Sequence, residues 1–193
     1  GPGFGGSCFK KDILNLVYLA KHFGLPEVAN FWEGVVHLNS WNIDRLTHII
    51  LEKLFGTLTE KRIGILGFSF KANTNDTRES PAIFIVSQLL KEGANLIIHD
   101  PKVNKRQIKE DLENFVSNNK NQEKDFASFS GSWQFSKDLM SHFNQAHAII
   151  VLTEWEEYIN LNWEQISKEV LNTAWVFDTR GILNKNIFKN SNV

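Results

Sequence analysis

The stretch IGILGFSFK, residues 63–71, determines the fold class. It begins as a short apolar run and ends in glycine and mixed residues, which predicts a buried β-strand followed by a loop. Similar apolar runs recur at residues 96–99, 148–152 and 175–177, with helical patterns between them. Apolar strands that alternate with helices predict a parallel sheet covered on both faces. We therefore expect an α/β fold, with a Rossmann-like, doubly wound domain over residues 57–193.

Cap and turn residues set the expected helix boundaries in this domain. Ser80 followed by Pro81 is a typical helix start, and Gly93 is a typical stop. Residues 117–132 are polar and rich in Asn, Lys and Ser, so we expect a surface insertion there. The expected helices are residues 81–92, 105–112, 136–143 and 163–170.

Two helices are expected before the first strand. Apolar residues recur at helical spacing over residues 11–23, and Gly24 is a suitable C-cap. Residues 26–54 carry a broad apolar stripe, and a helix of that length measures roughly 40 Å at 1.5 Å per residue. Such a helix is too long for one small domain, so it predicts an interdomain spine or a surface that pairs with a second subunit. We expect a loop and helical segment over residues 1–56, and the glycine-rich start suggests that the sequence begins inside a domain.

Composition excludes several functional classes. The net charge is −1, from 21 basic and 22 acidic side chains, without a basic stripe that would favour nucleic acid or an anionic membrane. No apolar run approaches the length of a membrane span, and no signal peptide begins the sequence. The single cysteine allows no internal disulfide, and the six histidines lack metal-ligand spacing. We expect a metal-free protein of a reducing compartment, the cytoplasm.

Ligands of open parallel sheets bind beyond the carboxyl ends of the strands. Phe70 and Lys71 follow the first predicted strand, and Arg180 follows the last. Two cations, an aromatic ring and the helix start at Ser80 suit a phosphorylated nucleotide. The alternative is that these are solvated loop charges. The glycine fingerprint G-x-G-x-x-G is absent, so the domain is a poor candidate for a dinucleotide site.

Cys8 is the candidate nucleophile. It follows a glycine-rich loop and stands at the start of a predicted helix, where the helix dipole and nearby Lys11 would favour the thiolate. Asp12 lies four residues on, on the same helix face. A lone cysteine can also be a small buried hydrophobe. The surrounding residues favour a reactive thiol over that alternative.

Four motifs, in order along nearly the whole chain, resemble those of the UDP-glucose 6-dehydrogenases. GFGGSCFKKD, residues 3–12, resembles the catalytic-cysteine motif, and residues 67–71 with 76–80 resemble the second signature. TEW at 153–155 and DTR at 178–180 match two later landmarks. The phenylalanine after the cysteine resembles the UDP-glucose enzymes more than their GDP-mannose or UDP-N-acetylmannosamine relatives. Ala72 and Asn73 depart from the family, which more often has Lys or Pro, then Asp.

The resemblance implies oxidation of UDP-glucose to UDP-glucuronate with two NAD. Cys8 would trap the intermediate aldehyde as a thiohemiacetal, and the later thioester would be hydrolysed. Lys11 would stabilise charge beside the cysteine. Asp12 would activate water or control the protonation of the alkoxide. The sugar pocket would be lined by Gly3, Phe4 and Gly5. The sugar nucleotide would be held by Phe70, Lys71 and Arg180. Arg78 would reach toward NAD.

The resemblance also implies an N-terminal NAD-binding domain that these residues do not contain, and a homo-oligomer formed through the long helix. We therefore expect the intact parent to be an enzyme and this chain alone to be inactive. Two alternatives stay open. One is a non-catalytic module for sugar-nucleotide binding or dimerisation, and the other is a dehydrogenase of a different nucleotide sugar.

Overall fold

The computed structural model describes residues 1–119 and 129–184, and these contain a parallel sheet of five strands in the order β3-β2-β1-β4-β5. The strands are β1 (Arg62–Leu66), β2 (Asn95–His99), β3 (Ser132–Phe135), β4 (Ala148–Val151) and β5 (Trp175–Asp178). The order reverses between β1 and β4, so their carboxyl ends form the switch point where such sheets bind ligands. The prediction of a Rossmann-like parallel sheet preceded by helices is confirmed.

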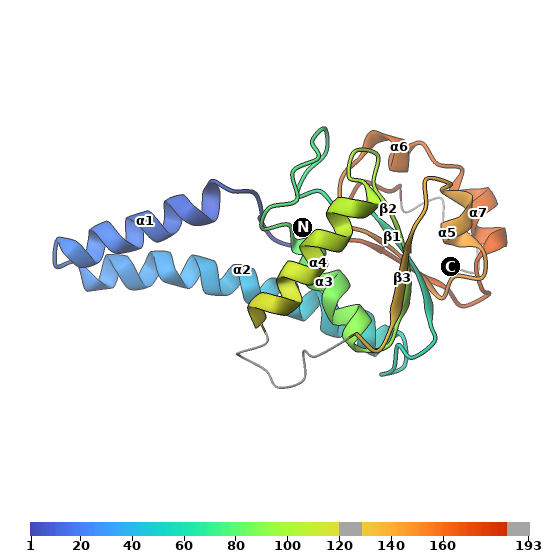
Figure 1. Ribbon diagram of the computed structural model, residues 1–193, viewed down its shortest axis with the longest axis horizontal. Coiled ribbons are helices and arrows are strands. Elements are labelled where there is room, and N and C mark those ends of the chain that lie inside the picture. The colour runs from blue at the N-terminus through green and yellow to red at the C-terminus, as the bar shows by residue number, and fades with distance from the viewer. Residues whose placement is uncertain (120–128, 185–193) are drawn as a thin grey trace.

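Helices cover both faces of the sheet (Figure 1). Alternate strand residues point to opposite faces. Ile63 and Ile65 therefore join one apolar cluster, and Leu66 joins the other. The first cluster includes the end of α2 (Pro26–Lys53), α3 (Pro81–Lys91) and α4 (Lys105–Asn119), whereas the second includes α5 (Met140–Phe143), α6 (Glu156–Ile159) and α7 (Trp163–Glu169).

A helical hairpin projects from this double-sided core (Figure 1). It consists of α1 (Phe9–His22) and the first part of the 28-residue α2. The turn between them uses Gly24 at φ +70°, and the Leu25 amide donates to the Ala20 carbonyl at 2.9 Å. The helices touch through a small cluster of Val17, Ala20 and Ala29, so most of their large apolar side chains lie outside it.

Several elements differ from the sequence prediction, which did not include the short helix α6. β3 was not expected, because its residues SWQF are only half-buried on the sheet edge and carry no apolar run. α4 continues past residue 112 because Phe115 packs edge-to-face on Phe84 of α3, with ring centroids 5.7 Å apart. The helix expected from residue 136 is reduced to α5, since Ser136 forms a turn with Asp138. Part of the expected surface insertion, residues 120–128, lies outside the described residues.

Candidate functional site

The loop after β1 lies at the switch point and is anchored to the end of β4. Gly67 has φ +96°, and a Cβ there would lie 2.4 Å from the side chain of Thr153. Only glycine tolerates both the left-handed conformation and this approach. The Thr153 hydroxyl donates to the Ser69 carbonyl at 2.7 Å. These contacts fix the path of the chain toward Phe70 and Lys71.

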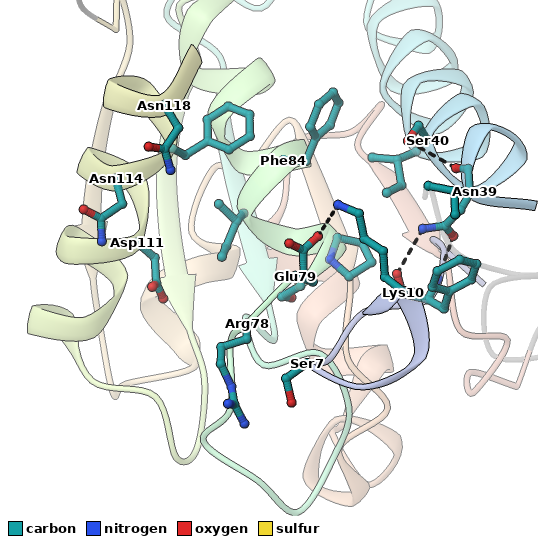
Figure 2. Close-up of a pocket in the computed structure, with 17 residues that line it drawn as sticks. Ser7, Lys10, Asn39, Ser40, Arg78, Glu79, Phe84, Asp111, Asn114 and Asn118 are labelled. Atoms are coloured by element: carbon teal, nitrogen blue, oxygen red, sulfur yellow. Dashed lines mark hydrogen bonds and ion pairs between the residues drawn. The ribbon is translucent and has the colours of Figure 1, made fainter. Parts of the chain in front are cut away.

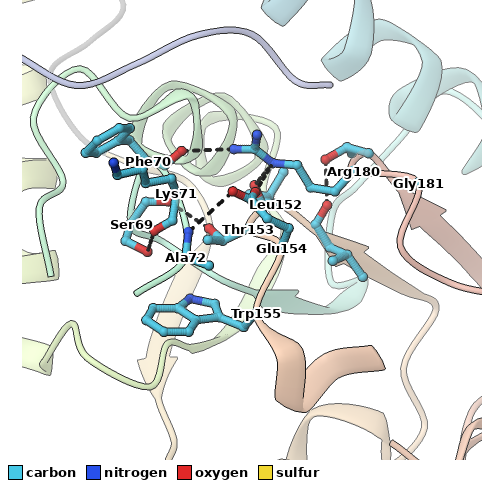
Figure 3. A network of polar contacts seen from close by, with 12 residues as sticks. Ser69, Phe70, Lys71, Ala72, Leu152, Thr153, Glu154, Trp155, Arg180 and Gly181 are labelled. Atoms are coloured by element: carbon cyan, nitrogen blue, oxygen red, sulfur yellow. Dashed lines mark hydrogen bonds and ion pairs between the residues drawn. The ribbon is translucent and has the colours of Figure 1, made fainter. Parts of the chain in front are cut away.

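Arg180 connects three strand ends (Figure 3). Its Nε donates to the Leu152 carbonyl at 2.8 Å, and its Nη2 donates to the Phe70 carbonyl at 3.0 Å. The Glu154 carboxylate lies 3.1 Å from Nε, while its other oxygen accepts from the Ala72 amide at 3.4 Å. Burial lowers the pKa of Arg180, and the charge of Glu154 opposes that shift. The guanidinium therefore joins β5 to β4 and to the loop after β1.

Phe70 links the strand-end loop to the cysteine loop. A Cβ on Gly6 would lie 3.0 Å from the Phe70 ring, and Gly6 has φ +86°. The Lys71 ammonium lies 5.4 Å from the centroid of the same ring, and Lys71 is exposed. The structure thus brings Phe70, Lys71 and the residue two before Cys8 into one region.

The cysteine loop is held from two further sides. The Gly6 amide donates to the Arg78 carbonyl at 2.9 Å. Asn39 of α2 accepts from the Phe4 amide at 2.8 Å and donates to the Phe4 carbonyl at 3.1 Å. Sequence reasoning missed Asn39, because a polar residue in a long helix gives no signal of a partner 35 residues away. Helix α2 therefore holds the backbone of Phe4, one of the predicted sugar-pocket residues, from both sides.

Cys8 is exposed at the N-cap of α1 and is not part of an apolar cluster of the described residues. Its Sγ lies 3.7 Å from the Ser7 hydroxyl, and its carbonyl accepts from the Asp12 amide at 2.8 Å. Lys11 and Asp12 are exposed in the first turn of the helix, and among the described residues neither has a hydrogen bond to the thiol. The thiol is therefore accessible to solvent in this structure.

Arg78 lies beside the cysteine loop and is paired with Asp76. Its Nε and Nη2 bind the two carboxylate oxygens at 3.0 and 2.8 Å. This pairing raises the pKa of Arg78 and lowers that of Asp76. The guanidinium stays exposed, so it remains accessible to an anionic ligand.

A cavity of about 920 Å³ opens between the cysteine loop, the loop before α3, and helices α2 and α4 (Figure 2). Of the predicted site residues, Phe4 and Arg78 line it. Lys10 crosses the cavity to Glu79 with an ion pair of 2.7 Å. The remaining predicted residues lie outside its lining, namely Gly3, Gly5, Cys8, Lys11, Asp12, Phe70, Lys71 and Arg180.

Asp100 follows β2, near the place where dinucleotide-binding folds put a ribose-binding acid. Here it is 3% exposed, and both of its oxygens accept hydrogen bonds from the protein. Within residues 1–119 and 129–184, no group of three or more His, Cys, Asp or Glu side chains could hold a metal ion. None of the helices in that part of the chain is long and apolar enough to cross a bilayer.

Comparison with known proteins agrees with this arrangement. Residues 64–185 match the UDP-binding domain of the UDP-glucose/GDP-mannose dehydrogenase family, and residues 1–41 match its central domain. The chain is 43% identical over 183 residues to UDP-glucose 6-dehydrogenase of Caenorhabditis elegans, covering 95% of this chain and 36% of the relative. It is 45% identical over 181 residues to that of Gallus gallus, covering 94% and 35%.

A solved structure extends the comparison to three dimensions. A UDP-glucose dehydrogenase from the archaeon Pyrobaculum islandicum superposes with a TM-score of 0.64 at 26% identity, over 91% of this chain and 38% of that one. The chain thus spans little more than a third of the length of these relatives. Since the UDP-binding model alone covers residues 64–185, the chain belongs to the UDP-glucose/GDP-mannose dehydrogenase family.

Proposed function

We propose that this chain supplies the cysteine nucleophile and the sugar-nucleotide site of an NAD-dependent UDP-glucose 6-dehydrogenase. The proposal rests on the packing of the Phe70 ring against Gly6. A Cβ placed on Gly6 would lie 3.0 Å from that ring. It joins the loop of the exposed Cys8 to the loop at the sheet's switch point. A nucleotide held at the strand ends would therefore extend its sugar toward the thiol.

Cys8 would act as the covalent nucleophile. Its thiolate would add to the carbonyl carbon of the aldehyde intermediate, and protonation of the oxygen would give a thiohemiacetal. Loss of the hydroxyl proton and of the hydride on that carbon, for which NAD would be the acceptor, would leave a thioester. Water then displaces the thiolate and releases the carboxylate. Asp12 would accept a proton from that water, and Lys11 would stabilise negative charge on the oxygen. Both side chains are exposed in the first turn of the cysteine's helix, which leaves them free to orient toward substrate.

The sugar nucleotide would lie between the two loops. Gly3, Phe4 and Gly5 would line the sugar pocket, where small residues let the substrate approach the backbone. Lys71 would pair with a phosphate and Phe70 would pack on the nucleotide. Arg180 would add positive charge behind them and hold the Phe70 carbonyl at 3.0 Å.

NAD, which the family resemblance implies as the oxidant, does not fit the described residues of the sheet domain. The glycine fingerprint is absent, and the Asp100 carboxylate is fully engaged by internal donors. We therefore propose that NAD is bound by other parts of the parent protein, with Arg78 as the contact from this chain. The exposed guanidinium, set beside the cysteine loop, supports that assignment.

The helical hairpin would form a homo-oligomer interface. It carries exposed Tyr18, Phe23, Phe31, Leu38 and Trp41, which are 57–71% exposed. Exposed apolar surface of this extent is typical of a binding surface. The boundary between this segment, residues 1–56, and the sheet domain, residues 57–193, is part of the same proposal.

Titration of the chain with UDP-glucose by calorimetry tests the proposal. GDP-mannose and UDP-N-acetylmannosamine serve as competing ligands. Lys71→Ala and Arg180→Ala should each weaken binding about tenfold or more, whereas Lys168→Ala, at an exposed position on α7, should leave it unchanged. Preference for a competitor would instead indicate a dehydrogenase of another nucleotide sugar.

If the chain binds no nucleotide sugar, an NAD-binding domain from a relative is added in trans. Turnover of UDP-glucose in that mixture would support the proposal that the parent protein is a UDP-glucose 6-dehydrogenase. Binding of UDP-glucose without turnover in the intact parent would identify a non-catalytic module.

A further inference from the structure

The Asp100 carboxylate accepts hydrogen bonds from the start of the loop that carries Phe70 and Lys71, and from two other segments. Oδ2 accepts from the Phe68 and Ser69 amides at 2.8 and 3.0 Å and from the Trp155 indole at 3.3 Å. The Ser69 hydroxyl lies 3.2 Å from the same oxygen. Oδ1 accepts from the Lys102 and Val103 amides, both at 2.9 Å.

These donors belong to three different strand ends. Phe68 and Ser69 follow β1, Trp155 follows β4, and Lys102 follows Asp100 itself after β2. The Ser69 hydroxyl also lies 3.0 Å from the Lys71 carbonyl of the residue that would bind phosphate, and its single proton is donated either there or to Asp100. One carboxylate thus fixes the start of the loop against both of its neighbouring strands.

We infer that Asp100 is a positioning residue for the sugar-nucleotide site, a role that rests on the proposed function. In dinucleotide-binding folds, an acid near this strand end faces the ribose. In this chain the acid is turned inward and buried, and it holds the loop that would contact the nucleotide. It acts through Ser69 on Phe70 and Lys71, and it touches no substrate.

Only a carboxylate satisfies this arrangement. Every described partner of the Asp100 side chain is a donor, and a carboxylate is acceptor-only. Asparagine has the same shape, but its amide nitrogen is itself a donor. In one orientation that nitrogen faces the Phe68 and Ser69 amides, and in the other it faces those of Lys102 and Val103. Both orientations leave buried donors opposed to a donor.

Hydrogen exchange of the 193-residue chain, measured by mass spectrometry, tests the inference with Asp100→Asn. Exchange should become faster in residues 67–75 while β1 and β4 keep their protection. The dissociation constant for UDP-glucose should rise about tenfold or more. Bound UDP-glucose should restore protection mainly in the loop, whereas a ligand that offsets a general loss of stability would restore it across the whole sheet. Ile108→Val, a small change at a buried position of α4, is the matched control and should change neither loop exchange nor affinity.

Two outcomes overturn the inference. One is unchanged exchange of the loop in folded Asp100→Asn, and the other is faster exchange spread evenly over the sheet. If Asp100→Asn does not fold, Ser69→Ala removes the hydroxyl and keeps the amides; unaltered loop exchange there also overturns it. If the wild-type chain alone binds no UDP-glucose, the addition of an NAD-binding domain in trans decides the proposed function, and the exchange data still decide whether Asp100 holds the loop.

Discussion

The Nη2 of Arg180 donates to the carbonyl oxygen of Phe70 at 3.0 Å, across 110 residues of sequence. The same guanidinium donates from Nε to the Leu152 carbonyl at 2.8 Å. Two carbonyls from different strand ends are therefore held by one planar group with fixed geometry. Arg180 thereby joins the end of β4 to the loop after β1.

Arg180→Lys separates these two contributions. Lysine keeps the positive charge but cannot reproduce the fork that spans Leu152 and Phe70. If holding the loop is the main role, UDP-glucose affinity should fall about as much as in Arg180→Ala, roughly ten- to a hundredfold for one to two hydrogen bonds to a charged group. Calorimetry measures both variants. Affinity retained in the lysine variant would show that charge alone is sufficient.

Gly6→Ala should separate the cysteine loop from Phe70. Alanine at φ +86° costs about 1–2 kcal/mol, and contact with the Phe70 ring adds about 1–3 kcal/mol. Gly24→Ala is the matched control, because Gly24 also has positive φ, +70°, but nothing lies within 4 Å of its Cβ position. Urea unfolding should show a larger loss of stability for Gly6→Ala. Equal losses would mean that the ring moves aside without cost.

Cys8 should react with iodoacetamide at a rate typical of an accessible thiol, because it is exposed in the free chain. UDP-glucose should slow this alkylation if the sugar lies against the thiol. Mass spectrometry measures the alkylation of Cys8.

The chain alone should form no NADH from UDP-glucose and NAD, since the described sheet domain does not fit a dinucleotide. Absorbance measures the formation of NADH. NADH formation by the isolated chain would contradict our assignment of NAD to other parts of the parent.

Stability should decrease as the pH falls from about 6.5 to about 4, partly because of His99. Burial, and next the charge of nearby His142, lower the pKa of His99 from its ordinary 6.5 to about 4. In this range the unfolded chain binds a proton that the folded chain does not, so the contribution is complete above pH 6.5 and is lost on acidification. The loss is on the order of 2–3 kcal/mol at pH 4. Tyr158, with its hydroxyl 2.9 Å from Nδ1, and Glu157, 3.5 Å from Nδ1, face the same ring, as does His142.

His99→Gln checks this assignment. The variant should have a shallower dependence of unfolding free energy on pH between 4 and 6.5, whatever its stability at neutral pH. His48→Gln, at an exposed site on α2, should keep the wild-type slope. Urea titrations at several pH values give the slopes, and identical slopes for His99→Gln and wild type would assign the pH effect to other groups.

The helical hairpin should mediate self-association. Phe31→Lys and Leu38→Glu, at positions 66% and 61% exposed, should shift sedimentation toward the monomer by placing charge in an apolar interface. Phe55→Glu, at an 81% exposed position beyond the end of α2, should leave the association unchanged. Monomeric wild-type chain at micromolar concentration would contradict the interface.

Local patterns in the sequence were sufficient for the main elements. The apolar runs at Ile63, Leu96 and Ala148, with caps at Ser80 and Gly93, predicted the parallel sheet, because burial on both faces of such a sheet requires continuous apolar strands. β3 was missed because an edge strand is half solvent-exposed and its pairing with β2 is set by tertiary contact.

The sequence by itself identified the residues that we propose for the chemistry: the single cysteine, the nearby Lys11 and Asp12, and the cations after the strands. Only the tertiary structure decided how these residues are held. Asn39 forms hydrogen bonds with Phe4, and Arg180 donates to the Phe70 carbonyl. Asp100 accepts hydrogen bonds from groups at three strand ends. Such contacts join positions far apart in the chain through hydrogen bonds whose partners are often backbone groups. Backbone groups are the same in every residue, so residue type carries no record of these pairings, and only folding brings the partners together.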